Sequence, residues 1–189
     1  LSKALPVERL NQSAVSFLED RKSDPWVVAC SGGADSTCLA LVASACFGQR
    51  GKSLVLAHFN HGLRGDDSDG DQEFVESLAE GLGAVFEKGG SCDCPESPSE
   101  AYLRDQRHSF LAEVCEKRGS VVLLMGHHRN DLAETMLMRL TRGSGAEGLA
   151  APRPLHQVRN LWRARPLLPL TRYELRNALQ QAGAPWRED

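Results

Sequence analysis

Residues 26–37 read WVVACSGGADST, an apolar run followed by a loop rich in glycine and serine. The run at residues 26–30 is typical of a short buried strand, and a helical apolar pattern follows over residues 37–47. A loop between a strand and a helix can bind an anion, because the first N–H groups of the helix have no partners within it. We therefore expect a phosphate-binding loop at residues 31–36.

The residues of this loop suit a nucleotide. Glycines let the backbone approach an anion, and the serine hydroxyls add donors. The predicted ATP-binding residues are Ser31, Gly32, Gly33, Ala34, Asp35 and Ser36. The Asp35 carboxylate would repel a polyphosphate unless a divalent cation lay between them, so we expect Mg²⁺ at Asp35. The alternative is that Asp35 only caps the helix.

Strand and helix patterns alternate on both sides of the loop. The expected strands lie at residues 26–30, 54–58, 84–87, 121–125 and 156–164. The expected helices lie at residues 7–20, 37–47, 71–82, 98–118, 130–142 and 172–182. This order predicts an α/β fold, a doubly wound and mostly parallel five-stranded sheet with helices on both faces. Such sheets bind ligands beyond the carboxyl ends of their strands.

Three of the expected helices carry further signals. Ser97, with Pro98 and Glu100 after it, is placed as the cap of helix 98–118. Thr171 and Glu174 form a second capping box. Helix 130–142 has apolar residues on one side, namely Leu132, Met136, Leu137 and Leu140.

The composition is that of one folded domain. The chain has 189 residues, 41% apolar and 25% charged, which excludes a disordered protein. The longest nearly apolar stretch, residues 38–47, is about half of what a membrane span needs, and residues 1–12 lack a secretory signal pattern. We therefore expect no membrane association, a cytoplasmic location and reduced cysteines. Cys92 and Cys94 are spaced too closely for a zinc knuckle.

Charge is unevenly distributed. Residues 1–138 carry 13 Lys and Arg against 21 Asp and Glu (net −8), whereas residues 139–189 carry 9 against 4 (net +5). The basic part includes Arg159, Arg163 and Arg172. A polyanion such as RNA and a solvated charged surface both account for this pattern.

Two common nucleotide motifs do not apply. The kinase and GTPase P-loop is absent, since no lysine follows the glycines of residues 31–36. Residues 143–148 match G-x-G-x-x-G but follow an expected helix rather than a strand, which excludes a dinucleotide site there. The SGGADS loop instead resembles the PP-loop of ATP pyrophosphatases, which cleave ATP between the α and β phosphates.

Five further segments narrow the resemblance. They are AHFNHGLR at residues 57–64, EAYLRDQR at 100–107, HHRNDLAET at 127–135 with RGSG at 142–145, RPLL at 165–168 and PWRED at 185–189. Together with the PP-loop, and in this order, they resemble the tRNA(Ile)-lysidine synthase family over residues 26–189.

The resemblance implies a two-step ligation. ATP adenylates the C2 carbonyl oxygen of the wobble cytidine in an isoleucine tRNA, and the amine of lysine then displaces AMP to give lysidine. In the family, the positions of Asp131 and Glu134 receive the lysine. The residues agree in type, because two carboxylates three apart share one face of a first helical turn and suit an ammonium. Stabilising a helix N-terminus is the alternative role.

The resemblance also assigns two arginines. Arg107 matches a position tied to the reacting nucleotide and suits the charge on phosphorus or the leaving pyrophosphate. Arg64 matches a position that faces the ATP pocket. The expected catalytic residues are Asp35, Arg107, Asp131 and Glu134. His58, His61, His127 and His128 follow strands and are expected to line the nucleotide cleft through backbone contacts rather than to hold a metal.

Family members continue beyond the position of Asp189 into tRNA-binding domains. The resemblance therefore implies that residues 1–189 are a single catalytic domain, with those domains absent from this chain. The expected partners are tRNA(Ile) with a CAU anticodon, L-lysine and ATP. Monomer and homodimer are both compatible with the sequence. Two alternatives are another PP-loop enzyme, such as a tRNA thiolase, and a domain that binds nucleotide or RNA without catalysis.

Overall fold

The computed structural model describes residues 1–49, 51–63, 65–90, 97–141 and 152–188. Arg64, Cys92 and Cys94 lie outside these ranges, and so does the glycine-rich segment 143–148. Within them, every helix is too short or too polar to cross a membrane.

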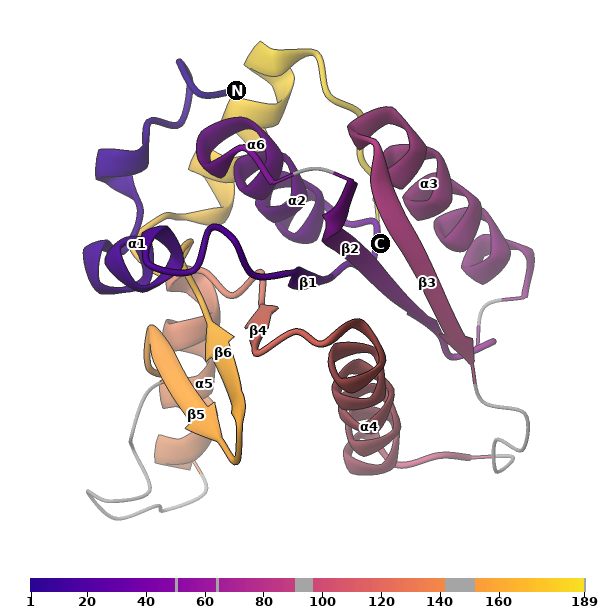
Figure 1. Ribbon diagram of the computed structural model, residues 1–189. Helices are drawn as coiled ribbons and strands as arrows, with labels where there is room; N and C mark the ends of the chain where they lie inside the picture. The colour runs from indigo at the N-terminus through magenta and orange to yellow at the C-terminus, as the bar shows by residue number, and fades with distance from the viewer. Residues whose placement is uncertain (50, 64, 91–96, 142–151, 189) are drawn as a thin grey trace.

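One mixed sheet forms the centre of the molecule (Figure 1). Its strands are β1 (Trp26–Ala29), β2 (Gly51–Asn60), β3 (Ala84–Gly90), β4 (Val122–Leu124), β5 (Leu155–Val158) and β6 (Leu161–Ala164). They lie in the order β3-β2-β1-β4-β6-β5, and only the β5–β6 pair is antiparallel. The predicted mostly parallel α/β sheet is confirmed.

The predicted number of five strands is wrong, because the described ranges contain six. The single strand expected at 156–164 is a hairpin, in which the chain turns back at Arg159 with a φ of 56°. Two-residue hairpin loops need positive φ, and glycine or asparagine commonly marks them. Here arginine takes that conformation, so no glycine or proline interrupted the strand pattern.

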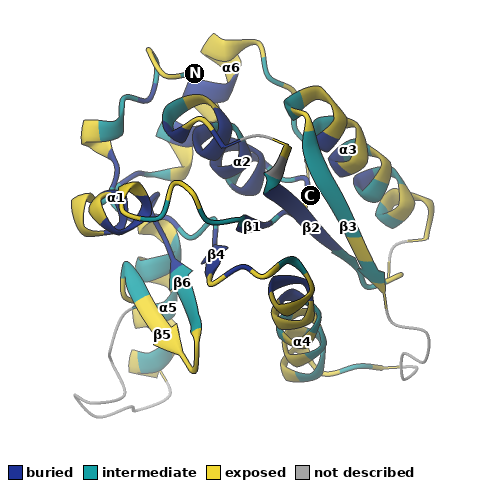
Figure 2. Ribbon diagram, viewed as in Figure 1, coloured by how far each residue is buried: buried dark blue, intermediate teal, exposed yellow. Residues whose placement is uncertain are grey.

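Helices cover both faces of the sheet, as predicted. They are α1 (Gln12–Glu19), α2 (Ala34–Phe47), α3 (Asp66–Leu82), α4 (Glu100–Arg118), α5 (Arg129–Thr141) and α6 (Arg172–Ala182), with a short 3₁₀ turn at Val7–Arg9. On one face, Trp26 and Val28 of β1 pack with α1, α2, α3 and α6; on the other, Val27 packs with α4. The alternation follows from the period of two along a strand. Figure 2 shows the buried strands between these layers.

The helix starts follow the sequence signals in part. α6 has the predicted capping box, in which the Thr171 hydroxyl accepts from Glu174 N and the Glu174 carboxylate accepts from Thr171 N. α4 begins two residues later than expected. Its cap is Ser99, whose hydroxyl accepts from Tyr102 N at 3.1 Å, and not Ser97.

The apolar side of α5 is largely exposed. Met136, Leu137 and Leu140 are 43%, 62% and 55% exposed, and α5 has no buried residue. A helical apolar pattern usually marks a face turned toward the core. In α5 the pattern predicted the helix but not its burial.

We predict that Thr171→Ala lowers the free energy of unfolding by about 1 kcal/mol, because it removes the cap of α6. Urea denaturation followed by circular dichroism measures the change. Gln181→Ala, at an exposed position near the other end of α6, is the matched control and should shift stability by less than about 0.5 kcal/mol. Equal effects of both changes would contradict the role of the cap.

Candidate active site

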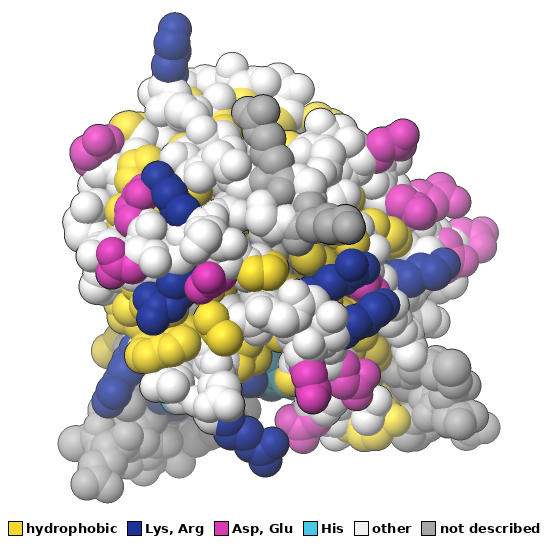
Figure 3. All heavy atoms as spheres, in the orientation of Figure 1, with side chains coloured by type: hydrophobic (Ala, Val, Ile, Leu, Met, Phe, Trp, Pro, Cys, Tyr) yellow, Lys and Arg dark blue, Asp and Glu magenta, His cyan; other side chains and the backbone are white. Residues whose placement is uncertain are grey.

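The loops that follow β1, β2 and β4 meet at the carboxyl edge of the sheet. They enclose a cleft of about 360 Å³. Its walls include five predicted site residues, namely Ser31, Asp35, Ser36, Arg107 and Asp131. Figure 3 shows a hollow on this side of the molecule, with histidine and basic side chains visible inside it. The cleft lies where the strand order reverses, because β1 pairs with β2 on one side and with β4 on the other, as expected for a ligand site in this class of sheet.

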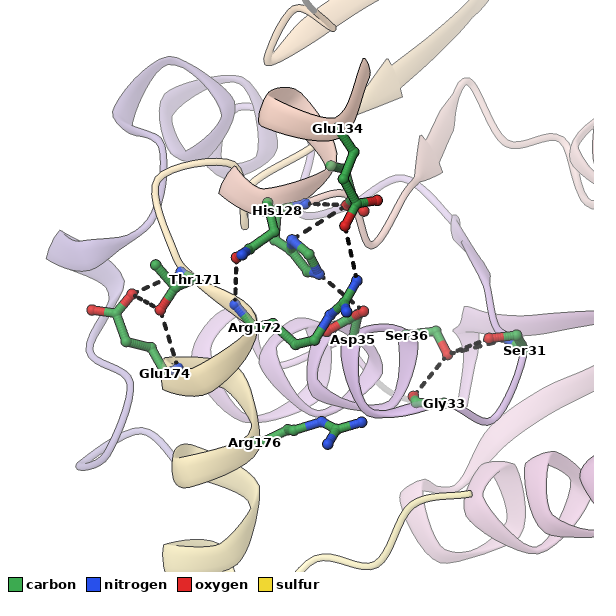
Figure 4. Close-up of polar contacts among 12 residues, drawn as sticks. Ser31, Gly33, Asp35, Ser36, His128, Glu134, Thr171, Arg172, Glu174 and Arg176 are labelled. Carbon is green, nitrogen blue, oxygen red and sulfur yellow. Dashed lines mark hydrogen bonds and ion pairs between the residues drawn. The ribbon is translucent and has the colours of Figure 1, made fainter. Parts of the chain in front are cut away.

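Ser36 gives the PP-loop its shape. Its hydroxyl oxygen accepts from the N–H groups of Ser31 and Gly32 at 3.1 and 3.2 Å and donates to Gly33 O at 3.1 Å. Figure 4 shows this contact at the start of α2. The Ser36 hydroxyl was expected to act as a phosphate donor, and in this structure its proton is directed to the loop itself. The first N–H groups of α2 have no partners within the helix, so this end of α2 suits an anion.

A segment far along the chain closes on the PP-loop. Gly32 has a φ of 96°, which favours glycine, and its carbonyl accepts from Arg187 N at 3.0 Å. The Arg187 side chain donates to Asp71 of α3 at 2.9 Å. Residues 185–189 were identified only by resemblance. Their contact with the loop is a functional arrangement that no local sequence signal reveals.

His128 connects Asp35 with Asp131. Its side chain is 0% exposed, and its Nε2 lies 3.2 Å from Asp35 Oδ2 (Figure 4). Asp131 Oδ2 accepts from the backbone N–H of His128 at 2.7 Å and lies 3.5 Å from its Nδ1. Burial alone would lower the pKa of His128, but the hydrogen bond to Asp35 and the charges of Asp35 and Asp131 raise it. Sequence reasoning had placed His128 in the cleft wall, whereas it lies beneath the wall.

The two carboxylates of α5 have different surroundings. Asp131 lines the cleft and also caps the first turn of α5 through His128 N, so its alternative role at a helix N-terminus is observed, whereas its role toward lysine stays a prediction. Glu134 lies outside the cleft wall, 57% exposed, with its Oε1 3.6 Å from Nη2 of Arg172. Figure 4 shows the side chains of Glu134 and Arg172 directed toward each other. An ammonium reaching Glu134 would compete with this guanidinium.

The other histidines of the loops each have a separate contact. His58 Nδ1 lies 2.9 Å from Cys30 O, His127 Nδ1 accepts from Arg165 Nε at 3.2 Å, and the His61 ring packs on Phe59 at 4.8 Å. His58, His61 and His127 line the cleft, as expected from the sequence, and each makes the side-chain contact just given in addition. In the described ranges, no three His, Cys, Asp or Glu side chains converge as a metal site.

A cation that is bound by both protein and substrate phosphate needs fewer protein ligands than a cation bound by protein side chains alone. The Oδ1 atom of Asp35 is buried and has no hydrogen-bond partner within the described chain. A buried carboxylate oxygen without a partner is costly. A Mg²⁺ ion bound through one carboxylate and substrate phosphates would satisfy it, so Asp35 fits the cation predicted there.

Comparison with known proteins supports this assignment of the loop. Residues 6–189 match the family model described as PP-loop domain. The chain is 37% identical over 174 residues to a tRNA(Ile)-lysidine synthase of Geobacter sulfurreducens, covering 89% of this chain and 36% of the relative. It is 39% identical over 172 residues to a tRNA(Ile)-lysidine synthase of Thermus thermophilus, covering 88% and 32%. The chain thus spans about a third of the length of these curated relatives.

Solved structures share the fold. The U34-tRNA thiolase NcsA from Methanococcus maripaludis superposes with a TM-score of 0.72 at 16% identity, covering 94% of this chain and 66% of that one. The NH3-dependent NAD synthetase from Campylobacter jejuni has a TM-score of 0.56 at 13% identity, covering 91% and 71%. These likenesses show the fold alone. By its sequence match over residues 6–189, the chain belongs to the PP-loop domain family, and its sequence is similar to those of tRNA(Ile)-lysidine synthases.

Proposed function

We propose that this chain is the catalytic domain of an enzyme that ligates lysine to the wobble cytidine of an isoleucine tRNA. The C2 carbonyl oxygen of the cytidine attacks the α-phosphorus of ATP, and the bond to the β-phosphate breaks to release pyrophosphate. The amine of lysine then adds to C2, loses a proton, and AMP leaves with the carbonyl oxygen. The observation that carries this proposal is the meeting of the PP-loop carboxylate Asp35 with Asp131 of α5 across one buried histidine.

The PP-loop side binds the triphosphate. The first N–H groups of α2, which have no partners within the helix, and the partial positive charge of that helix end favour phosphate oxygens. Asp35 would hold Mg²⁺ through its unpartnered Oδ1. The ion would neutralise charge on the phosphates during the reaction.

Arg107 faces the same cleft from α4. Desolvation and, second, the charge of Arg104 lower the pKa of Arg107, yet a guanidinium remains protonated at neutral pH. A fixed positive charge here stabilises the negative charge that develops on phosphorus or on pyrophosphate. Arg64, the other arginine assigned to the ATP pocket, stays a prediction because it lies outside the described residues.

The α5 side receives lysine. Asp131 offers a carboxylate at the cleft wall, and Glu134 offers a second one a turn farther out. Their spacing suits the two amino groups of lysine, or one amino group and a proton acceptor. Binding of lysine at Glu134 replaces one cation, Arg172, with another.

A thiolase is the enzyme alternative, and the cysteines argue against it. Sulfur transfer needs a reactive thiolate, which requires a low pKa. Burial raises the pKa of Cys30, in the cleft wall, to about 11 and that of Cys115 to about 12. Burial likewise raises the pKa of Cys38 to about 12. Among the described cysteines, therefore, none has the depressed pKa of a catalytic thiolate.

A domain that binds nucleotide without catalysis is the second alternative. One experiment separates catalysis from binding alone. It measures pyrophosphate release from ATP in the presence of tRNA(Ile) and lysine, and again with tRNA(Ile), lysine or both left out. The proposal predicts release that depends on tRNA, and AMP release that depends on lysine as well. ATP binding without pyrophosphate release would leave only the binding domain.

We predict that Asp35→Ala lowers the rate of pyrophosphate release at least about 100-fold, because several kcal/mol of transition-state stabilisation depend on the cation. A continuous pyrophosphate assay measures it. Asp20→Asn, at an exposed position at the end of α1, is the control and should retain the wild-type rate. A near wild-type rate in the Ala variant would refute the metal-bridging role of Asp35.

We predict that Asp131→Asn and Glu134→Gln leave tRNA adenylation largely intact and raise the lysine concentration needed for half-maximal transfer by roughly 10-fold or more. Each change preserves shape and removes one charge-assisted contact, worth about 1.5–3 kcal/mol. Pyrophosphate and AMP release, measured separately, report the two half-reactions. Loss of pyrophosphate release with unchanged lysine dependence would instead assign the pair to the nucleotide site.

We predict that the basic part of the chain contributes to tRNA binding. Arg159 lies in the β5–β6 turn, Arg163 lies on β6, and Arg172 begins α6. Replacing all three with Gln should weaken binding and reduce the slope of log K against log salt by about 0.7–0.9 per lost phosphate contact. Filter binding over a range of salt concentrations measures the slope. An unchanged slope would show that these arginines form a solvated surface.

A further inference from the structure

Arg165, at the end of β6, contacts the cleft through His127. The arginine is buried, with 8% of its surface exposed. Its Nε donates to His127 Nδ1 at 3.2 Å, and its Nη1 donates to Arg153 O at 2.9 Å. A buried arginine that donates to a histidine is unusual, because both side chains can carry positive charge. The contact therefore restricts the protonation of the histidine.

The chemistry of the two groups fixes the position of one proton. A guanidinium can only donate, so His127 Nδ1 must accept with its lone pair. Neutral imidazole carries a single proton, and this proton is then on Nε2. Burial and the charge of Arg165 lower the pKa of His127 to about 4, so the neutral form prevails at pH 7. Asp131 raises this pKa, and Arg107 and Arg104 lower it further.

The other ring nitrogen is available to a ligand. His127 lines the cleft with Asp35 and Arg107, and its Nε2 has no hydrogen-bond partner in the ranges that the structure describes. His58, in the same wall, has the opposite arrangement. Its Nδ1 contacts the carbonyl oxygen of Cys30 at 2.9 Å and must donate to it, which leaves Nε2 as an acceptor. His127 thus offers the cleft an imidazole donor, and His58 offers it an imidazole acceptor.

We propose that Arg165 is a positioning residue that holds His127 as a neutral Nε2–H donor, and that this N–H bonds a phosphate oxygen of the nucleotide in the cleft. The second half of this proposal rests on the proposed function, and the first half does not. A neutral imidazole can stabilise developing negative charge as a donor without giving up its proton. Arg107 supplies charge from α4, and His127 supplies a directed hydrogen bond.

Nuclear magnetic resonance of protein labelled with ¹⁵N-histidine tests the first half without nucleotide. At pH 7 we expect His127 to be protonated only at Nε2 and His58 only at Nδ1. Arg165→Met places a methyl carbon where Nε was and should give His127 a mixture of both neutral forms and a higher pKa. The internal control is His108, whose pKa is lowered to about 4 by burial and by Arg163, and which Arg165 does not contact. His127 protonated at Nδ1 in the wild type would overturn the proposal.

A matched pair of variants separates positioning from packing. Gln places its amide nitrogen at the same bonded position as arginine Nε, so Arg165→Gln keeps a donor to His127 and loses the charge. Arg165→Gln should preserve the Nε2–H form, and Arg165→Met should not. Urea denaturation checks that both variants fold, and Arg176→Gln, in an exposed pair with Glu188, is the surface control. Equal tautomer populations in the Gln and Met variants would refute positioning by Arg165.

Titration with pyrophosphate, with AMP and with ATP plus Mg²⁺ tests the second half. We expect the ligand whose phosphate contacts His127 to shift the Nε2 resonance of that histidine. The shift should be smaller in Arg165→Met. In the pyrophosphate-release assay, Arg165→Met should lower kcat about 10-fold or more, and Arg165→Gln should restore much of it. Binding of ATP that leaves the His127 resonances unchanged would refute the phosphate contact. Absence of any ATP binding, with the wild-type tautomer intact, would instead refute the proposed function.

Discussion

The charge balance at His128 is the interaction on which the arrangement of the cleft depends. Asp35 lies in the first turn of α2, and Asp131 lies in the first turn of α5. Their two carboxylates face the same buried side chain and repel each other, more strongly than they would in water. The imidazole between them is fully buried; burial lowers its pKa, but the hydrogen bond to Asp35 and the charges of both carboxylates raise it, so a protonated ring at this position would offset that repulsion. The PP-loop and the first turn of α5 therefore lie close together at the carboxyl edge of the sheet. A substrate that bridges the two loops can then contact a phosphate-binding helix end and a carboxylate of α5 at once.

The parallel pairing of β1 with β4 makes this contact geometrically available. Val28 of β1 lies opposite Leu124 of β4, so the loops that follow leave the sheet at the same level. Gly126 continues this approach, because a Cβ there would lie 3.3 Å from the backbone of Asp35 and Ser36. The small residue at 126 lets the two loops pack backbone to backbone. Packing and charge together thus determine the spacing of the two sides of the cleft.

The sequence predicted the elements and motifs of this site better than the contacts between them. Alternating strand and helix patterns predicted the α/β class, and the SGGADS segment follows β1 as expected, although its last three residues already form the first turn of α2. Local patterns could not show that Arg165 reaches His127, 38 positions away, since such contacts depend on tertiary packing. They also could not show that Arg172 pairs with Glu134, or that α5 leaves its apolar side exposed. The hairpin at Arg159 was missed because arginine, rather than glycine, takes the positive φ of its turn, and the Asn160 that follows did not by itself mark a break in the strand pattern.

The contact between Gly32 and Arg187 has a consequence for synthesis of the chain. The two residues pair through the backbone across about 155 positions, and Asp71 of α3 holds the arginine from the other side. A ribosome adding roughly 5–20 residues per second needs on the order of ten to thirty seconds between the two. During that interval the emerging loop lacks the strand-like partner that later supports it. Strands β1 to β6 all precede Arg187 in the chain, so the nucleotide pocket cannot be completed until after the last of these strands has been made.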